Sequence, residues 1–137
     1  EAQEDASEAV RLRPDWFETW LVRGDLRVAL GRPAEAVDDY SQALRLKRDH
    51  VAAWVRRGAA RLLLETQAAR LDAVADFTHA LELSPSDADA LAGRGGAFFA
   101  LKRYDAAASD WTRATELRPD WRARLAPMIE EARRKEK

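Results

Sequence analysis

The chain has 137 residues, of which 47% are hydrophobic, so it is long and apolar enough to bury the core of one domain. Its 23 basic and 24 acidic residues leave a formal net charge of −1, a balance that argues against nucleic acid and anionic membranes as partners. No apolar run reaches the roughly 20 residues that span a bilayer, and the absence of cysteine excludes disulfides and thiolate metal sites.

One spacing recurs along the whole chain. Four alanines, Ala9, Ala43, Ala80 and Ala114, are separated by 34, 37 and 34 residues. The same shifts relate further columns: Trp20, Trp54 and Leu91; Gly24, Gly58 and Gly95; Ala36, Ala73 and Ala107; Tyr40, Phe77 and Trp111; and Pro14, Arg48, Pro85 and Pro119. Self-similarity at a fixed period of this length indicates an array of structural repeats.

In chain order, apolar residues three and four positions apart predict helices throughout. Residues 1–16 read as the second helix of a truncated repeat, helical over about 1–13, so we expect the chain to be a piece of a longer protein. Residues 17–50 form a repeat with helices over about 17–30 and 33–47, and residues 51–87 form a second repeat. Residues 88–121 form a third, with helices over about 88–101 and 104–117, and residues 122–137 form a capping helix.

The second repeat carries three extra residues, which lie between Leu62 and Leu71. We expect a helix lengthened by a turn or a wider hairpin loop, and a partner-specific contact is the alternative. In the capping helix, Pro127 lacks an amide donor, so it predicts a kink or a restart.

Small residues stand where the helices of each hairpin must approach, and the aromatic column fills the space beside them. The turns carry matching signals, because Gly31 suits a left-handed helix end and Pro33 suits a first turn. The aspartates before the following helices are predicted N-caps: Asp15, Asp49, Asp87 and Asp120.

Charged residues also recur in the repeat frame. Arginine precedes each glycine of the glycine column, at Arg23, Arg57 and Arg94, and aspartate recurs at Asp5, Asp39, Asp76 and Asp110. Our hypothesis is a ladder of arginine and aspartate, within a hairpin or between neighbours, that fixes the register of the helices more than it adds net stability. Ligand binding by these residues is the alternative.

The residues Trp20, Gly24, Ala36, Tyr40 and Ala43 of one unit, and Gly95, Tyr104, Ala107, Trp111, Ala114 and Pro119 of another, resemble the tetratricopeptide repeat signature. The resemblance covers nearly the whole chain. It implies an all-α fold, a right-handed α-α superhelix of helix-turn-helix repeats closed by a C-terminal capping helix.

In this family the first helices line a concave groove that holds peptides. Carried over to this chain, the resemblance implies a groove lined by Leu21, Asp25, Val28, Val55, Arg56, Ala59, Leu62, Asp89, Gly93, Gly96 and Phe99. Glu18, Val22, Ala29, Ala52, Leu63, Ala92 and Ala100 complete the lining. The two glycines Gly93 and Gly96 are expected to bare a strip of backbone to a ligand.

The same resemblance argues against one use of the fold, the clamp for acidic carboxyl-terminal tails, because a carboxylate needs cationic and amide donors around it. The clamp positions hold Leu21, Asp25, Arg56, Asp89 and Gly93, of which only Arg56 suits. We therefore favour an extended or helical ligand with apolar anchors, carrying a basic residue for Asp25 or Asp89.

Nothing in the sequence predicts catalysis, a cofactor or a metal. The two histidines, His50 and His79, have no partner at nucleophile or ligand spacing and are expected on the surface. The glycines at 93, 95 and 96 fall inside a predicted helix with no preceding strand, unlike a phosphate-binding loop.

The sequence thus predicts a non-catalytic, cytoplasmic scaffold for a protein or peptide partner, with no nucleic acid and no membrane. The alternative is a structural spacer, or a module that associates with itself through the open N-terminal repeat face.

Overall fold

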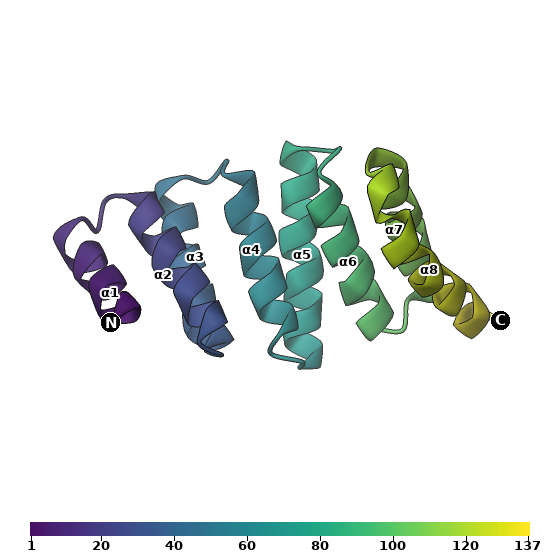
Figure 1. Ribbon diagram of the computed structural model, residues 1–137, viewed down its shortest axis with the longest axis horizontal. Coiled ribbons are helices and arrows are strands. Elements are labelled where there is room, and N and C mark those ends of the chain that lie inside the picture. Colours follow the sequence, from purple (N-terminus) through teal and green to yellow (C-terminus); the bar gives the residue numbers. More distant parts are fainter.

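The computed structural model describes all of residues 1–137 as eight α-helices and one short 3₁₀ helix. They are α1 (Ala2–Leu12), α2 (Phe17–Ala29), α3 (Pro33–Leu46), α4 (Val51–Leu62), α5 (Gln67–Leu83), α6 (Ala88–Ala100), α7 (Tyr104–Leu117), η1 (Pro119–Trp121) and α8 (Arg122–Glu136). Helices pack in chain order as the hairpins α2–α3, α4–α5 and α6–α7. The hairpins lie side by side in a row, and the two termini are at its opposite ends (Figure 1). The predicted all-α repeat fold is confirmed, with each predicted helix end within one residue of the observed one.

Glycine and aromatic side chains set the spacing inside each hairpin. A Cβ added to the glycine would lie 2.6, 2.9 and 2.5 Å from the facing ring in the pairs Gly24–Tyr40, Gly58–Phe77 and Gly95–Trp111. Since even a methyl group does not fit, glycine alone allows this approach. The facing alanines are 0% exposed in all three hairpins, at Ala36, Ala73 and Ala107. The predicted close packing of the helices is confirmed.

The three inserted residues lengthen the second helix of the middle hairpin. Helix α5 has 17 residues, whereas α3 and α7 have 14 each. Thr66 caps the added turn, because its side chain accepts a hydrogen bond from the Ala69 amide at 3.1 Å. The expectation of a lengthened helix is therefore confirmed.

Only one of the four predicted aspartate caps is present. The Asp87 carboxylate accepts from the Ala90 amide at 2.9 Å, at the start of α6. The N-cap positions of α2 and α4 fall one residue later than predicted, at Trp16 and His50, so Asp15 and Asp49 lie outside the helices. Asp120 lies within η1 and binds Arg118 instead. These three predictions are wrong, because the turns between repeats continue one residue further.

Tryptophan side chains brace two of these turns. The Trp20 indole donates to the carbonyl of Pro14 at 2.9 Å, and the Trp54 indole donates to the carbonyl of Arg48 at 2.8 Å. The hydrogen bond to the turn is therefore the same whether proline or arginine occupies the position. In the third repeat Leu91 replaces the tryptophan and is buried in the core instead.

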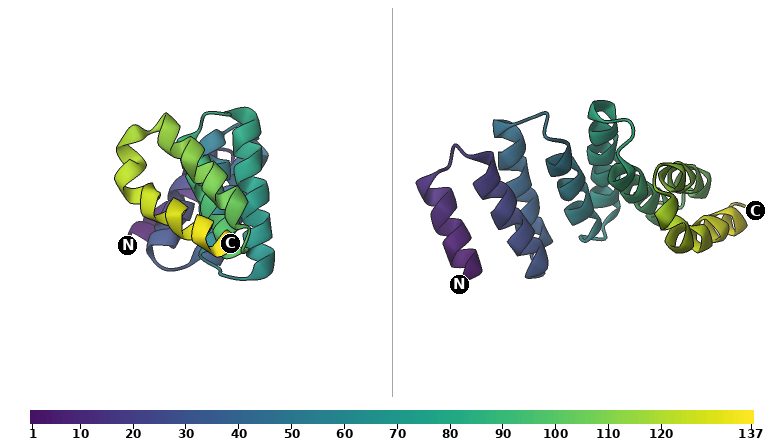
Figure 2. Two further views of the ribbon diagram at one scale, coloured as in Figure 1. Left: turned by 90° about the vertical axis from the view of Figure 1, so that its right-hand side faces the viewer. Right: turned by 45° about the horizontal axis from the view of Figure 1, so that its top comes forward.

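Helix α8 packs against α7 and covers the end of the last hairpin through the buried Leu125 and Ala132. It runs through Pro127 without interruption, so the predicted restart is absent. Viewed from other directions, successive hairpins turn relative to one another (Figure 2). None of the helices is both long and apolar enough to cross a membrane.

Candidate functional site

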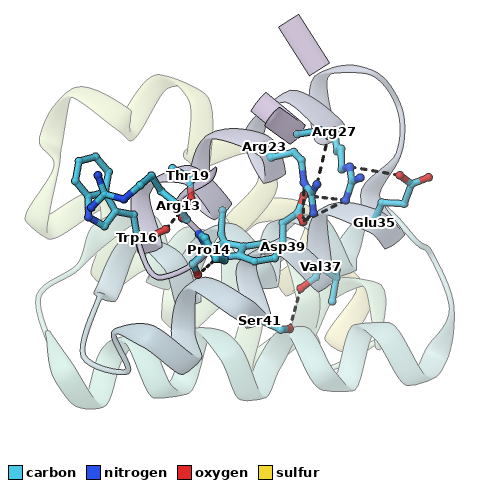
Figure 3. Close-up of polar contacts among 12 residues, drawn as sticks. Arg13, Pro14, Trp16, Thr19, Arg23, Arg27, Glu35, Val37, Asp39 and Ser41 are labelled. Atoms are coloured by element: carbon cyan, nitrogen blue, oxygen red, sulfur yellow. Dashed lines mark hydrogen bonds and ion pairs between the residues drawn. The ribbon is translucent and has the colours of Figure 1, made fainter. Parts of the chain in front are cut away.

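Buried ion pairs hold the first helix of every hairpin against the second. The shortest distance between guanidinium and carboxylate is 2.8 Å in each of the pairs Arg23–Asp39, Arg57–Asp76 and Arg94–Asp110. A second arginine, Arg27, also reaches Asp39 at 3.0 Å, so two guanidinium groups converge on one carboxylate (Figure 3). The hypothesis of an arginine and aspartate ladder is confirmed for these three hairpins.

The ladder also joins neighbouring hairpins. The same three arginines donate from Nη1 to a hydroxyl of the preceding second helix, at Ser7, Ser41 and Thr78, over 3.4, 3.0 and 3.3 Å. Each arginine thus bridges two repeats, which fixes how the first helices line up along the array. Asp5 departs from the prediction, because it is exposed and forms no ion pair.

The surface that the ladder positions is formed by α2, α4 and α6 and is called here the first-helix face. Several of its residues are exposed, among them Val22 at 53% and Leu63 at 56%. Ala59 and Asp89 are exposed too. Leu21 differs, because it is only 7% exposed and belongs to the core around Tyr40. We therefore place Leu21 in the core and leave it out of the binding surface.

Two more of the predicted groove residues mainly serve packing. Val55 and Leu62 are half-buried and pack on the core cluster around Phe77. Gly93 is not a strip of bare backbone, since a Cβ there would lie 2.5 Å from the Phe77 ring. Its role is to accept the aromatic ring of the preceding hairpin.

Four of the predicted residues, Asp25, Val28, Arg56 and Ala59, meet in a pocket of about 250 Å³ between α2 and α4. We call it the α2–α4 pocket. Tyr40, Ala60 and Leu63 complete its lining. Two others, Gly96 and Phe99, line a separate pocket of about 330 Å³ at the other end of the array.

A polar network crosses the α2–α4 pocket. The Tyr40 hydroxyl donates to Asp25 Oδ1 at 2.6 Å, and Arg56 Nη1 donates to Asp25 Oδ2 at 3.1 Å. Burial of the hydroxyl, together with this hydrogen bond to a carboxylate, raises the pKa of Tyr40 above its ordinary value. Both oxygens of Asp25 are thus occupied within the protein, which the sequence did not indicate.

The histidines have structural roles. The His50 ring accepts a hydrogen bond from the Ala53 amide at 3.2 Å and so caps α4. His79 stacks on Trp54 with ring centroids 4.6 Å apart, and its side chain is 57% exposed. The expectation of a surface position holds for His79, whereas the cap at His50 was missed because histidine is an uncommon cap residue. No group of three or more His, Asp or Glu side chains is placed to hold a metal ion.

Known proteins of the same fold match this arrangement. The family model described as tetratricopeptide repeat matches residues 1–47, 21–71 and 70–122. The TPR domain of Arabidopsis OM64 superimposes with a TM-score of 0.79 at 27% identity, covering 88% of this chain and 96% of that one. The first TPR domain of human RPAP3 gives a TM-score of 0.81 at 25% identity, covering 90% and 97%.

A third structure, described as the first TPR of Spaghetti (RPAP3) bound to the HSP90 peptide SRMEEVD, gives a TM-score of 0.77 at 24% identity. It covers 85% of this chain and 94% of that one. No curated protein sequence matches the chain. Because the family model matches nearly all of the helical repeats, the chain belongs to the tetratricopeptide repeat family.

Proposed function

We propose that this chain is a non-catalytic protein-interaction module that binds a peptide or helical segment along the first-helix face. The observation that carries the proposal is the exposure of aliphatic side chains there, Val22 of α2 at 53% and Leu63, which lines the α2–α4 pocket, at 56%. Exposed apolar residues beside a concave pocket are typical of surfaces that bury a partner's side chains.

The charges of this face favour an apolar ligand over an acidic one. The peptide bound by the similar RPAP3 domain, SRMEEVD, carries three acidic residues. In this chain Arg56 is the only cation among the predicted clamp positions, and Asp25 holds it at 3.1 Å. The charge of this one cation is thus already offset by Asp25. A basic ligand residue is better directed to Asp89, which is exposed and forms no ion pair.

The test compares two charge-matched double variants. Val22→Glu with Leu63→Glu places two carboxylates on the first-helix face, whereas Leu71→Glu with Leu83→Glu places two at equally exposed positions of α5, a second helix. Peptides are first selected on the wild-type protein from a displayed library, and their affinity is then measured by fluorescence polarisation. All four residues are about half exposed, so both variants are expected to fold.

Selected peptides are expected to bind the Val22→Glu and Leu63→Glu variant at least tenfold more weakly than the wild-type protein. Their affinity for the α5 variant is expected to equal their affinity for the wild-type protein. Equal affinity for both variants would reject the first-helix face as the site. Failure to select any peptide would favour the spacer over the peptide-binding module.

A second candidate function is self-association through α1. Ala2 and Asp5 are exposed, whereas Ala36 and Asp39, at the same repeat positions in α3, are 0% and 1% exposed. A second copy could cover this face. Sedimentation velocity tests the idea: the mass should rise with concentration, and Ala2→Glu should abolish the rise. A constant monomer mass would reject it.

A further inference from the structure

The last junction of the array contains an apolar pocket, called here the α6–α8 pocket. Its volume is about 330 Å³, and it is lined by Gly96, Phe99, Trp111, Pro127, Met128 and Glu131. Glu131 is its single charged residue, and its carboxylate already binds Arg134 and lies 3.7 Å from Lys135 Nζ. The Trp111 indole donates to the carbonyl of Ala92 at 3.1 Å. The polar groups of the lining are therefore already satisfied within the protein.

This pocket occupies the same place in the repeat frame as the α2–α4 pocket. A shift of 71 residues relates five of the lining positions: Asp25 to Gly96, Val28 to Phe99, Tyr40 to Trp111, Arg56 to Pro127 and Ala60 to Glu131. The first pocket is crossed by the ion pair between Asp25 and Arg56, and both members of that pair are absent from the second. At the middle junction, Phe77 and Gly93 stand at the positions of Tyr40 and Arg56, and the Phe77 ring packs on Gly93. The last site is therefore a pocket that lacks the ion pair of the first.

Gly96 has no role in packing that would explain it. A Cβ on each of the other four helical glycines would lie 2.5 to 2.9 Å from an aromatic ring, whereas a Cβ on Gly96 has nothing within 4 Å. Glycine in a helix interior destabilises the helix relative to alanine, so such a residue normally has a packing or functional reason. Here its consequence is an open space beside Phe99 and Trp111.

We propose that the α6–α8 pocket binds one bulky apolar side chain, aromatic or the size of leucine, presented by the protein segment that docks on the first-helix face. The proposal rests on the proposed function and adds the residue class that the ligand must carry. Phe99 and Trp111 supply aromatic surface for such a side chain, and Met128, 39% exposed, adapts to its shape. The occupied carboxylate of Glu131 leaves no free charge to attract a cationic side chain.

The first experiment uses single amino-acid probes rather than peptides. Two-dimensional ¹H–¹⁵N NMR spectra are recorded during titration with N-acetyl-tryptophanamide, N-acetyl-leucinamide and, as a polar comparison, N-acetyl-lysinamide. The two apolar probes are expected to shift the amide signals of Phe99 and Met128 until the shifts saturate. The lysine probe is expected to cause no saturable shift of these signals. The absence of saturable shifts at these residues, or equal shifts with all three probes, would overturn the proposal.

The variants Gly96→Leu and Gly96→Asp test the same pocket. The leucine fills it, and the aspartate introduces the carboxylate of the equivalent first site. Both are expected to fold, since the space around the added Cβ is open. Each should weaken binding of the apolar probes at least tenfold, while Ala75→Leu, at an exposed position of α5, should not. Unchanged binding to both Gly96 variants would reject the pocket as the site.

Peptide binding then separates the two proposals. If selected peptides carry a common aromatic or leucine-like residue and lose tenfold affinity for Gly96→Leu, both proposals are supported. If peptides need Val22 and Leu63 but bind Gly96→Leu normally, the first-helix face is the site and the pocket proposal fails. If the probes enter the pocket but no peptide binds, the pocket takes apolar side chains while the proposed function fails.

Discussion

Three aspartates are buried: Asp39 and Asp76 are 1% exposed, and Asp110 is 7% exposed. Removing a charge from water costs several kcal/mol, so each must be neutralised where it lies. The planar fork of arginine does this with two parallel hydrogen bonds, for example from Arg94 to Asp110 at 2.8 and 2.9 Å. Because the bonds are directional, they select one alignment of the paired helices.

Replacing one buried carboxylate should therefore be costly. Asp76→Ala leaves Arg57 and Arg61 without a counter-ion, although their side chains are only 16% and 21% exposed. We expect a loss of about 3–5 kcal/mol in the free energy of unfolding, measured by urea denaturation. Asp72→Ala, at an exposed position of the same helix, should change it by less than about 0.5 kcal/mol. Similar losses in both variants would contradict the assigned role of the ladder.

The cap at His50 makes stability depend on pH. Only the neutral ring can accept the hydrogen bond from the Ala53 amide, and burial lowers the pKa of His50 below its usual 6.5, as do Lys47 and Arg56 nearby. The unfolded chain thus binds this proton at higher pH than the folded protein. The contribution of His50 is fully present above pH 6.5 and declines as the pH falls from there toward the folded pKa.

Urea denaturation between about pH 7.5 and pH 5 measures this decline. In the variant His50→Asn, which retains a capping side chain but does not titrate, the slope of unfolding free energy against pH should be smaller. An identical slope in the two proteins would show that other groups cause the dependence.

At the scale of the element, the three hairpin turns share one backbone feature. The same repeat position has a left-handed conformation in each, with φ of 76° at Gly31, 56° at Glu65 and 63° at Lys102. Side chains with a Cβ pay a steric cost there, whereas glycine does not. The second and third turns therefore hold strain that the first turn avoids.

Lys102→Gly should relieve that strain. We expect an increase of about 1 kcal/mol in the free energy of unfolding, because a left-handed residue with a Cβ costs about 1–2 kcal/mol and glycine is more flexible when unfolded. Thermal and urea denaturation would measure it. Lys102→Ala keeps the Cβ and is the control, for which we expect no gain. A gain of the same size in both variants would attribute the effect to the lysine charge instead.

At the scale of the whole molecule, helices contact mainly the helices next to them in the chain, and the ends of the row do not meet (Figure 2). In such an array, stability is approximately a sum over neighbouring units. A destabilising substitution near one end should thus promote local unfolding at that end more than at the other. This distinguishes the chain from a domain with a single central core.

Leu125→Ala tests this behaviour. Leu125 is 2% exposed in the core formed by α6, α7 and α8, so its truncation should cost about 2–5 kcal/mol locally. Hydrogen exchange should accelerate in α6–α8 more than in α1–α3. Leu21→Ala, in the core of the first hairpin, should reverse the pattern. Uniform acceleration along the chain would mean that the array unfolds as one unit.

Much of the fold was predictable because its determinants are close in the sequence. The columns headed by Gly24 and Tyr40 place small and aromatic residues at fixed distances, and the observed contacts follow them. The surface was less predictable. The position of a residue in the first helix of its repeat did not indicate that Leu21 is buried. Nor did it indicate that Gly93 lies against Phe77 of the preceding hairpin.

The sequence by itself determined the helices and their pairing, because helix periodicity and the repeat spacing are properties of neighbouring residues. The tertiary structure decided that arginine and aspartate pair within each hairpin. Only the tertiary structure decided which repeat junctions are open. Asp25 and Arg56 are 31 residues apart in the sequence. Gly96 and Pro127 occupy the equivalent repeat positions and are also 31 residues apart in the sequence. Whether each pair forms a polar bridge across a pocket depends on side chains from three helices meeting in space, which no local pattern records.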